Sequence, residues 1–231
     1  MGTQIDHLVI GAATLKQGIA AVNDWLGVNV PYGGSHEKMG THNCLMRLGD
    51  DIFLEIIALS NSPGSLEQPR WFGLDNPYVR YRITAQPTLL GWVVNTENLN
   101  NLIASAHCSM GQIEHITRGE LHWLFSLPED GRLLAGGLIP YAIEWQTDSH
   151  PSTMMADLGC HLLKLDLHHN QPTWLRSSLE SIGAADLITI HTLPHNTPPY
   201  LLATISTPQG IKEISSQLQF TGNKDIRLQT P

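Results

Sequence analysis

The chain has few cysteines, few basic residues and no long apolar run. Its three cysteines, Cys44, Cys108 and Cys160, are odd in number, far apart and outside any C-x-x-C spacing. A disulfide framework or a zinc-cysteine site is therefore disfavoured, and a reducing compartment is the simpler expectation. No stretch approaches the roughly 18 apolar residues of a membrane-spanning helix, and the first residues carry no basic or apolar leader. We therefore expect a cytoplasmic protein with no membrane partner.

Positive charge is also scarce. The 231 residues include 13 Lys and Arg against 21 Asp and Glu, a formal net charge of -8. Contacts with nucleic-acid phosphates need clustered Lys and Arg, so nucleic acid is excluded as an expected partner. A hydrophobic content of 42% with 15% charged residues is typical of a packed globular protein.

A pattern of apolar strand, amphipathic helix and later glutamate-bearing strand occurs three times. The first copy runs from residues 6–10 to 53–57, the second from 90–94 to 142–145, and the third from 161–165 to 211–214. The interval from His7 to Gly27 equals that from Gly91 to Gly111 (27 − 7 = 20 and 111 − 91 = 20), so the first two copies align. Repetition of this kind sets the architecture.

Apolar spacing and capping residues predict three helices. Leu15, Ile19, Val22 and Leu26 form one stripe between Thr14, a capping residue, and Gly27. A second helix is predicted near 98–107 and a third from Pro172 to Gly183. Short strands are predicted after the first two helices, at 28–31, 43–48, 52–58, 112–117, 121–127 and 141–146.

The resulting fold class is α+β. Two β-α-β-β-β modules are expected over residues 1–150, with module one at 1–60, a loop at 60–87 and module two at 88–150. The prolines and glycines of 60–87 favour a loop. A third β-α-β-β-β-like unit is expected at 155–231. Since that unit has no partner with which to close a second cup, we expect it to pack on the first two or to mediate homodimerisation.

These modules resemble the vicinal oxygen chelate superfamily, which includes glyoxalase I, bleomycin resistance proteins and extradiol dioxygenases, and more closely its glyoxalase-like domain group. The resemblance rests on paired β-α-β-β-β units and on six short stretches of the sequence, which are 6–10, 33–36, 40–43, 54–57, 71–74 and 143–145. It implies a half-open, barrel-like cup in which strand residues hold a divalent metal ion. Carried over position by position, it implies His7, Glu55 and Glu144 as ligands, whereas Gly91-Trp92 stands where a fourth ligand would be.

Residue chemistry agrees with a cation at this place. Phe53, Glu55 and Ile57 share one face of their strand, and a glutamate on an enclosed face needs a cation or an arginine beside it. One histidine with two carboxylates favours Mg, Mn, Ni or Zn acting as a Lewis acid over the iron of a dioxygenase.

Around the cup, further residues are candidates for chemistry. Glu144 and His122 are the candidates for proton transfer. The candidates for substrate contact are His42, Asn43, Trp71 and Phe72, and the alternative for each is a structural strand or core residue.

Three functions remain open. The first is a metal-dependent lyase or isomerase acting on a small oxygenated molecule. The second is a protein that binds and sequesters a small molecule without catalysis, and the third, less favoured, is a dioxygenase.

Overall fold

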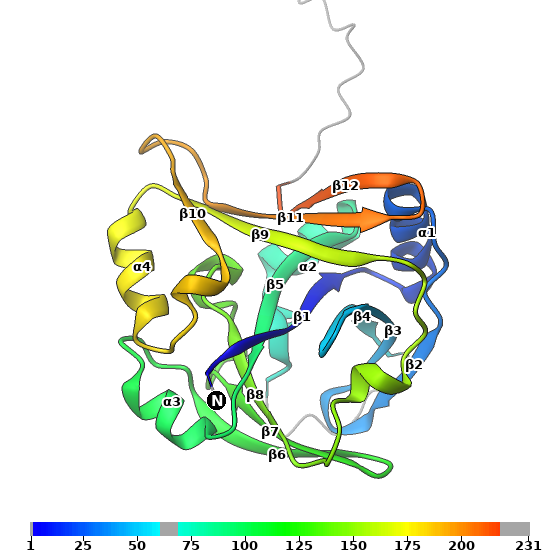
Figure 1. Ribbon diagram of the computed structural model, residues 1–231, viewed down its shortest axis with the longest axis horizontal. Helices are drawn as coiled ribbons and strands as arrows, with labels where there is room; N and C mark the ends of the chain where they lie inside the picture. Colours follow the sequence, from blue (N-terminus) through cyan, green and yellow to red (C-terminus); the bar gives the residue numbers. More distant parts are fainter. Residues whose placement is uncertain (1, 61–68, 218–231) are drawn as a thin grey trace, which may run out of the picture.

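The structure is a computed structural model that describes residues 2–60 and 69–217. Residues 61–68 of the expected loop and 218–231 of the expected third unit lie outside the described residues. The chain forms two sheets with four α-helices among the described residues (Figure 1). This α+β arrangement confirms the predicted fold class.

The first two modules have the predicted element order. Module one consists of β1 (Gln4–Gly11), α1 (Leu15–Leu26), β2 (Tyr32–His36), β3 (Thr41–Gly49) and β4 (Ile52–Leu59). Module two consists of β5 (Thr88–Asn95), α3 (Leu99–Ser105), β6 (Gln112–Arg118), β7 (Leu121–Leu127) and β8 (Tyr141–Trp145).

Helix α1 begins and ends where its sequence predicts. The Thr14 side chain accepts a hydrogen bond from the Gln17 backbone N–H, and Gly27 ends the helix in the left-handed conformation at φ 73°. A β-carbon is disfavoured in that conformation, so glycine is suited to the position. Buried Val22 and Leu26 face the core, which confirms the amphipathic stripe.

The segment between the modules differs from the prediction. The loop expected at 60–87 contains helix α2 (Pro77–Ala85) and a short 3-10 turn, η2 (Trp71–Gly73). Asn76 caps α2 by accepting hydrogen bonds from the Tyr78 and Val79 backbone N–H groups. Pro77 therefore starts a helix, because its missing N–H is not needed in the first turn.

The strand predicted at 28–31 begins later in the structure. Val28 and Val30 are buried in the core directly after α1, and β2 starts at Tyr32, where it pairs with β3. The two buried valines give residues 28–31 the apolar pattern of a strand, although this segment only leads into β2.

Sheet A curls into a half-barrel with strand order β2-β3-β4-β1-β5-β8-β7-β6. The modules join where β1 and β5 pair antiparallel, with Leu8 opposite Trp92. Each face of the sheet supports its own core. Leu8, Leu54 and Ile56 belong to the outer core under the helices, whereas the alternate residues Val9 and Ile57 belong to the inner core of the cup.

The third unit is built from β9 (His161–His169), α4 (Pro172–Glu180), β10 (Thr189–Thr192), β11 (Tyr200–Thr207) and β12 (Gly210–Ser215). Its strand order is β10-β9-β11-β12, so its first strand, β9, has a neighbour of the same unit on each side. In contrast, β1 and β5 each lie at the end of the four strands of their own module. Leu165, Leu201 and Ile205 share the outer core with the residues of sheet A. Sheet B therefore covers the outer face of the cup, as Figure 1 shows for β9, β11 and β12 above β1.

Candidate functional site

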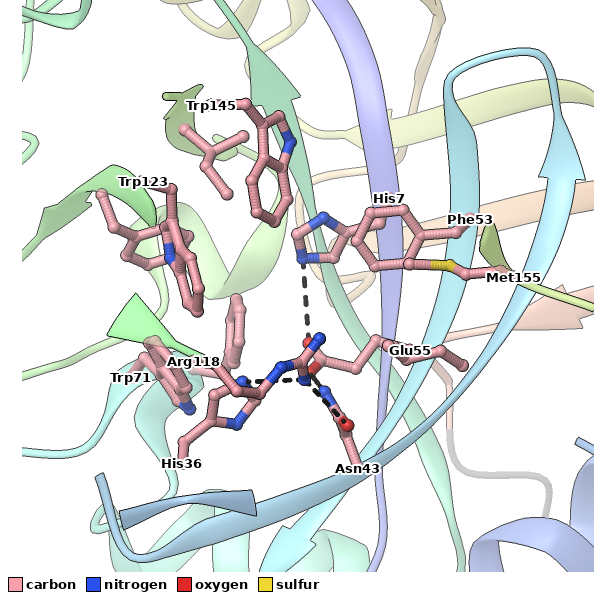
Figure 2. A pocket seen from close by; sticks show the side chains of 14 residues that line it. His7, His36, Asn43, Phe53, Glu55, Trp71, Arg118, Trp123, Trp145 and Met155 are labelled. Carbon is pink, nitrogen blue, oxygen red and sulfur yellow. Dashed lines mark hydrogen bonds and ion pairs between the residues drawn. The ribbon is translucent and has the colours of Figure 1, made fainter. Parts of the chain in front are cut away.

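A cavity of about 40 Å³ opens on the inner face of sheet A. Its walls combine a few polar side chains with many aromatic ones (Figure 2). The lining residues are His7, His36, Asn43, Leu45, Phe53, Glu55, Trp71, Phe72, Arg118, Trp123, Phe125, Ile143, Trp145 and Met155.

A β-bulge places two adjacent polar residues at this cavity. Ile5 pairs with Val94 and His7 with Val93, so Asp6 is the extra residue of β1 at that point. A bulge interrupts the alternation of side chains along a strand. As a result Asp6 and His7 contact each other, with 2.5 Å between an Asp6 carboxylate oxygen and His7 Nδ1.

Asp6 is fully buried and binds three donors. Besides His7, its second oxygen accepts from Trp145 Nε1 at 2.7 Å and from His150 Nε2 at 2.9 Å. Burial by itself would raise the pKa of Asp6, but the hydrogen bonds and charges of His150 and His7 hold it below its ordinary value. His150 Nδ1 accepts the Ser152 backbone N–H, so Nε2 of neutral His150 carries the proton that is donated to Asp6.

Glu55 faces His7 from β4. Its Oε2 lies 3.7 Å from His7 Nε2, too far for a hydrogen bond. Its other oxygen accepts a hydrogen bond from the Asn43 side-chain amide at 2.7 Å. Since Asp6 accepts the Nδ1 proton of His7, the Nε2 lone pair of neutral His7 is directed toward Glu55 and the cavity.

At the opposite side of the cavity, His36 and Arg118 meet. Arg118 Nη1 lies 3.4 Å from His36 Nε2. Burial, with a further contribution from the Arg118 charge, lowers the pKa of His36 to about 3, so His36 is neutral near pH 7. Because β2 and β6 are the two edges of sheet A, this contact joins the free edges of the curled sheet.

The structure brings together five of the predicted site residues. His7, Glu55, Asn43, Trp71 and Phe72 all line the cavity. Asn43, Trp71 and Phe72 are buried, and the alternation predicted for Phe53 and Glu55 holds along β4.

Glu144, predicted both as ligand and as catalytic residue, lies elsewhere. Ile143 and Trp145 line the cavity, so the residue between them points to the other face of β8. The Glu144 carboxylate accepts the Leu99 backbone N–H at 2.8 Å, at the start of α3, where a negative charge stabilises the helix.

His122 and His42 also lie outside the cavity lining. His122 is an exposed residue of β7, and the next residue, Trp123, is the one that lines the cavity. His42 precedes Asn43 on β3 and points to the opposite face. Neither His122, predicted for proton transfer, nor His42, predicted for substrate contact, therefore lines the cavity.

The residues present do not complete a metal site of protein ligands. His7 Nε2 and Glu55 Oε2 face each other, and Asp6 supports His7 as a carboxylate supports a metal-bound histidine. Across residues 2–60 and 69–217, however, no group of three or more His, Cys, Asp or Glu side chains lies close enough together to hold a metal ion. Arg118 adds a positive charge to the same cavity. Two donors are fewer than the three protein ligands of a typical catalytic metal site.

Several cavity residues were not predicted from the sequence. Trp123 and Trp145 could have been found from alternation along β7 and β8. His150, which contacts Asp6 behind the cavity, is the last residue of the predicted module two, and Arg118 lies between the strands predicted at 112–117 and 121–127. No sequence pattern connects these last two to His7, because chain distances of 111 and 143 residues separate them from it (118 − 7 and 150 − 7).

The half-barrel of paired modules and its inner cavity define a protein of the vicinal oxygen chelate superfamily. A family model described as a glyoxalase-like domain matches residues 5–183, and the chain belongs to that family. A search of curated proteins found no match.

Among solved structures, a hypothetical protein from Staphylococcus aureus is similar in fold, with a TM-score of 0.57 and 11% identity over 93% of this chain and 85% of that one. Methylmalonyl-CoA epimerases also match. That of Mycobacterium tuberculosis has a TM-score of 0.38 and 15% identity over 62% of this chain and 86% of its own. That of Streptomyces coelicolor has 0.40 and 12% over 64% and 100%. Scores this low add nothing to the functional argument. None of the helices in the described residues is long and apolar enough to cross a membrane.

Proposed function

We propose that the chain is an enzyme of the lyase or isomerase type that moves a proton on a small oxygenated molecule bound in the cavity. The observation that carries the proposal is the buried Asp6–His7 pair, whose free imidazole nitrogen is directed at the cavity. An imidazole held in this way by a carboxylate is a common general base.

His7 takes the proton and Asp6 keeps it in place. Asp6 accepts the Nδ1 proton, which fixes the tautomer with a lone pair on Nε2 and stabilises the imidazolium formed when Nε2 takes a proton. Trp145 and His150 hold the Asp6 carboxylate through its other oxygen. The base is therefore supported before the substrate arrives.

Glu55 is the second proton-transfer group of this proposal. Its Oε2 is 3.7 Å from His7 Nε2, so the proton that His7 takes from a substrate beside both groups can be returned to the same or a neighbouring substrate atom, directly or by way of Glu55. The hydrogen bond from Asn43 orients the Glu55 carboxylate. Aromatic walls, including Phe53 stacked on His7 with ring centroids 4.4 Å apart, exclude water from the reaction.

A second candidate keeps the metal ion that the family resemblance implied. His7 and Glu55 would be the protein ligands of a divalent ion such as Mg, Mn, Ni or Zn, one fewer than the three of a typical catalytic metal site. The ion would polarise a carbonyl group of the substrate. The Asp6–His7 contact favours this candidate as well, because metal-bound histidines usually donate their second ring N–H to a carboxylate or carbonyl.

The test is proton exchange in D2O. Hemithioacetals of small α-ketoaldehydes and small diketones are incubated with the protein, and loss of the α-proton signal is followed by ¹H NMR. We expect exchange that falls by about 10²-fold or more in His7→Gln. The control Glu144→Gln should keep the full rate because Glu144 faces away from the cavity.

Each result separates the candidates. Exchange that persists after chelator treatment, in protein free of divalent metal by elemental analysis, supports proton transfer by His7 without a metal. Exchange that disappears with the chelator and returns with one added ion supports the second candidate. Ligand binding without exchange supports a sequestering protein, and full exchange in His7→Gln contradicts the proposal.

A further inference from the structure

Arg118 is the one Lys or Arg among the residues that line the cavity. The guanidinium group carries five N–H donors and stays charged. Here the contacts found for it are two long ones, both from Nη1, to His36 Nε2 and to the Asn43 carbonyl oxygen at 3.4 Å each. Burial lowers the pKa of Arg118, and the charge of Glu55 acts in the opposite sense.

Glu55 does not neutralise Arg118 by direct contact. The Asn43 amide lies between them, since it donates to Glu55 at 2.7 Å and accepts from Arg118 at 3.4 Å. Within the described residues no carboxylate lies within 4.0 Å of the Arg118 guanidinium. The fork of Arg118 is therefore open to an acceptor with two oxygens.

A second donor near this end of the cavity lacks a hydrogen-bond partner among the described residues. Trp71 is 3% exposed, and its indole Nε1 is a buried donor without a hydrogen bond among the described residues. The Trp71 ring meets His36 edge to face at 4.9 Å, and His36 in turn contacts Arg118. A buried N–H without an acceptor is costly, and an oxygen of a bound molecule would remove that cost.

Much of the remaining lining is aromatic. Trp123 and Trp145 lie 5.3 Å apart, and Trp71 and Phe125 lie 5.5 Å apart between ring centroids. Figure 2 shows Trp71, Trp123 and Trp145 along one side of the cavity, with His7 and Glu55 on the other. Rings of this kind bind a planar apolar group by stacking or edge contacts.

We infer that the cavity takes a small carboxylate with a flat apolar body. The carboxylate binds the fork of Arg118 and the body lies against the tryptophans, within reach of His7 and Glu55. The inference rests on the proposed function for the chemistry at His7, but the binding it describes does not require catalysis.

Arg118 can be reached from outside. It also lines a cavity between Tyr32 and the segment 151–156, and another between the two edge strands β2 and β6. A charged ligand can therefore meet Arg118 before its apolar part enters the cup. The positive charge of Arg118 thus favours anionic ligands at the entrance of the cavity.

The experiment compares benzoate with benzamide, which has the same ring and no charge. Binding to the full chain is measured at pH 7 by quenching of tryptophan fluorescence and by calorimetry. We expect benzoate to bind about 10- to 100-fold more tightly than benzamide, the factor expected for one charge-assisted hydrogen-bonded pair. In Arg118→Gln this difference should vanish while benzamide affinity stays the same.

Two further variants sharpen the result. Arg118→Lys keeps the charge without the fork and should retain only part of the difference. The control Arg80→Gln changes an exposed arginine of α2 and should leave both affinities unchanged. Equal affinity for the two probes, failure of both to bind, or an undiminished preference for benzoate in Arg118→Gln would overturn the inference.

The outcome is independent of the proposed function. His7→Gln should still prefer benzoate over benzamide, because His7 is not part of the carboxylate contact. If benzoate preference depends on Arg118 but no exchange is found with any substrate, the carboxylate site stands and the enzymatic proposal fails. If exchange depends on His7 but benzoate and benzamide bind with equal affinity, the enzymatic proposal stands and the carboxylate site fails.

Discussion

Replacing Asp6 by asparagine tests the network that supports His7. The Asp6 carboxylate is fully buried and accepts from His7, Trp145 and His150 at 2.5, 2.7 and 2.9 Å. Hydrogen bonds to a charged group contribute about 1.5–3 kcal/mol each and neutral ones about 0.5–1.5 kcal/mol. Removing the charge weakens three such bonds by about 1 kcal/mol each, so we expect Asp6→Asn to lower the free energy of unfolding by about 3 kcal/mol.

The substitution should also change the tautomer of His7. An asparagine side chain has one oxygen, and Trp145 and His150 both need it as an acceptor. The indole N–H of Trp145 can only donate, and His150 must keep its proton on Nε2 because its Nδ1 accepts the Ser152 backbone N–H. The amide NH₂ then faces His7 Nδ1, which must become an acceptor, and the His7 proton moves to Nε2. The lone pair directed at Glu55 is lost, so the proposed proton exchange should fall together with stability.

The pH dependence has a defined sign. The pKa of Asp6 in the folded protein is lower than its ordinary value of 3.8. The charged network therefore contributes its full stability above about pH 4, and this contribution is lost as the pH falls from 3.8 through the folded-state pKa. The difference between wild type and Asp6→Asn should be constant from pH 7 to pH 5 and shrink below pH 4.

Urea unfolding followed by fluorescence measures the stability, and ¹⁵N NMR of the imidazole nitrogens reports the tautomer. Asp50→Asn is the control, since that side chain is 96% exposed and its ion pair with Arg47 lies at the surface, so the change in stability should be no more than about 1 kcal/mol. The reasoning is refuted if the two variants are equally stable, if their difference persists unchanged at pH 3, or if His7 keeps its proton on Nδ1 in Asp6→Asn.

Two further predictions concern residues outside this network. Glu144→Gln should lower the free energy of unfolding by only about 0.5 kcal/mol, because glutamine can still accept the Leu99 N–H. Benzoate binding measured by calorimetry should be unchanged in this variant, and a loss of binding would show that Glu144 acts on the cavity after all. Tyr141→Phe should cost about 1–3 kcal/mol in urea unfolding, since the buried Tyr141 hydroxyl accepts the Phe72 N–H at 3.1 Å and donates toward the Gly131 carbonyl at 2.9 Å; wild-type stability in this variant would mean that Phe72 has found another acceptor.

Periodicity and capping residues predicted most of the fold. Helices α1 and α4 were predicted because their apolar stripes, caps and end residues agree with one another. Helix α2 was missed because its apolar stripe is weak, with only Val79 and Ile83 buried, while its neighbouring prolines favour a loop. The third unit was predicted by element order, but its strand order depends on packing against the outer core, which the sequence pattern does not contain.

The polar part of the site was partly predictable. Glu55 and Phe53 share a face because strands alternate, and this could be read directly from the sequence. The joint placement of Asp6 and His7 could not, because it depends on a bulge whose position is set by the pairing of β1 with β5. His150 reaches Asp6 only because the segment after β8 folds back over the cup.

The failure of Glu144 to join His7 shows how the duplicated modules differ. A repeat suggests that both copies supply equivalent ligands. However, a shift of one residue along a strand moves a side chain to the opposite face of the sheet. In β8 the side chains that point into the cup are those of Tyr141, Ile143 and Trp145. Module one accordingly supplies the acid–base and amide groups, whereas module two supplies aromatic walls and a single cation. A symmetric scaffold thus forms an asymmetric cavity, with the proposed proton-transfer groups His7 and Glu55 from module one and with Arg118 and two tryptophans from module two. This division is what a site needs if it is to hold a molecule by one end and react with it at the other. The residues of each module that line it are His7, His36, Asn43, Leu45, Phe53 and Glu55 from module one, and Arg118, Trp123, Phe125, Ile143 and Trp145 from module two.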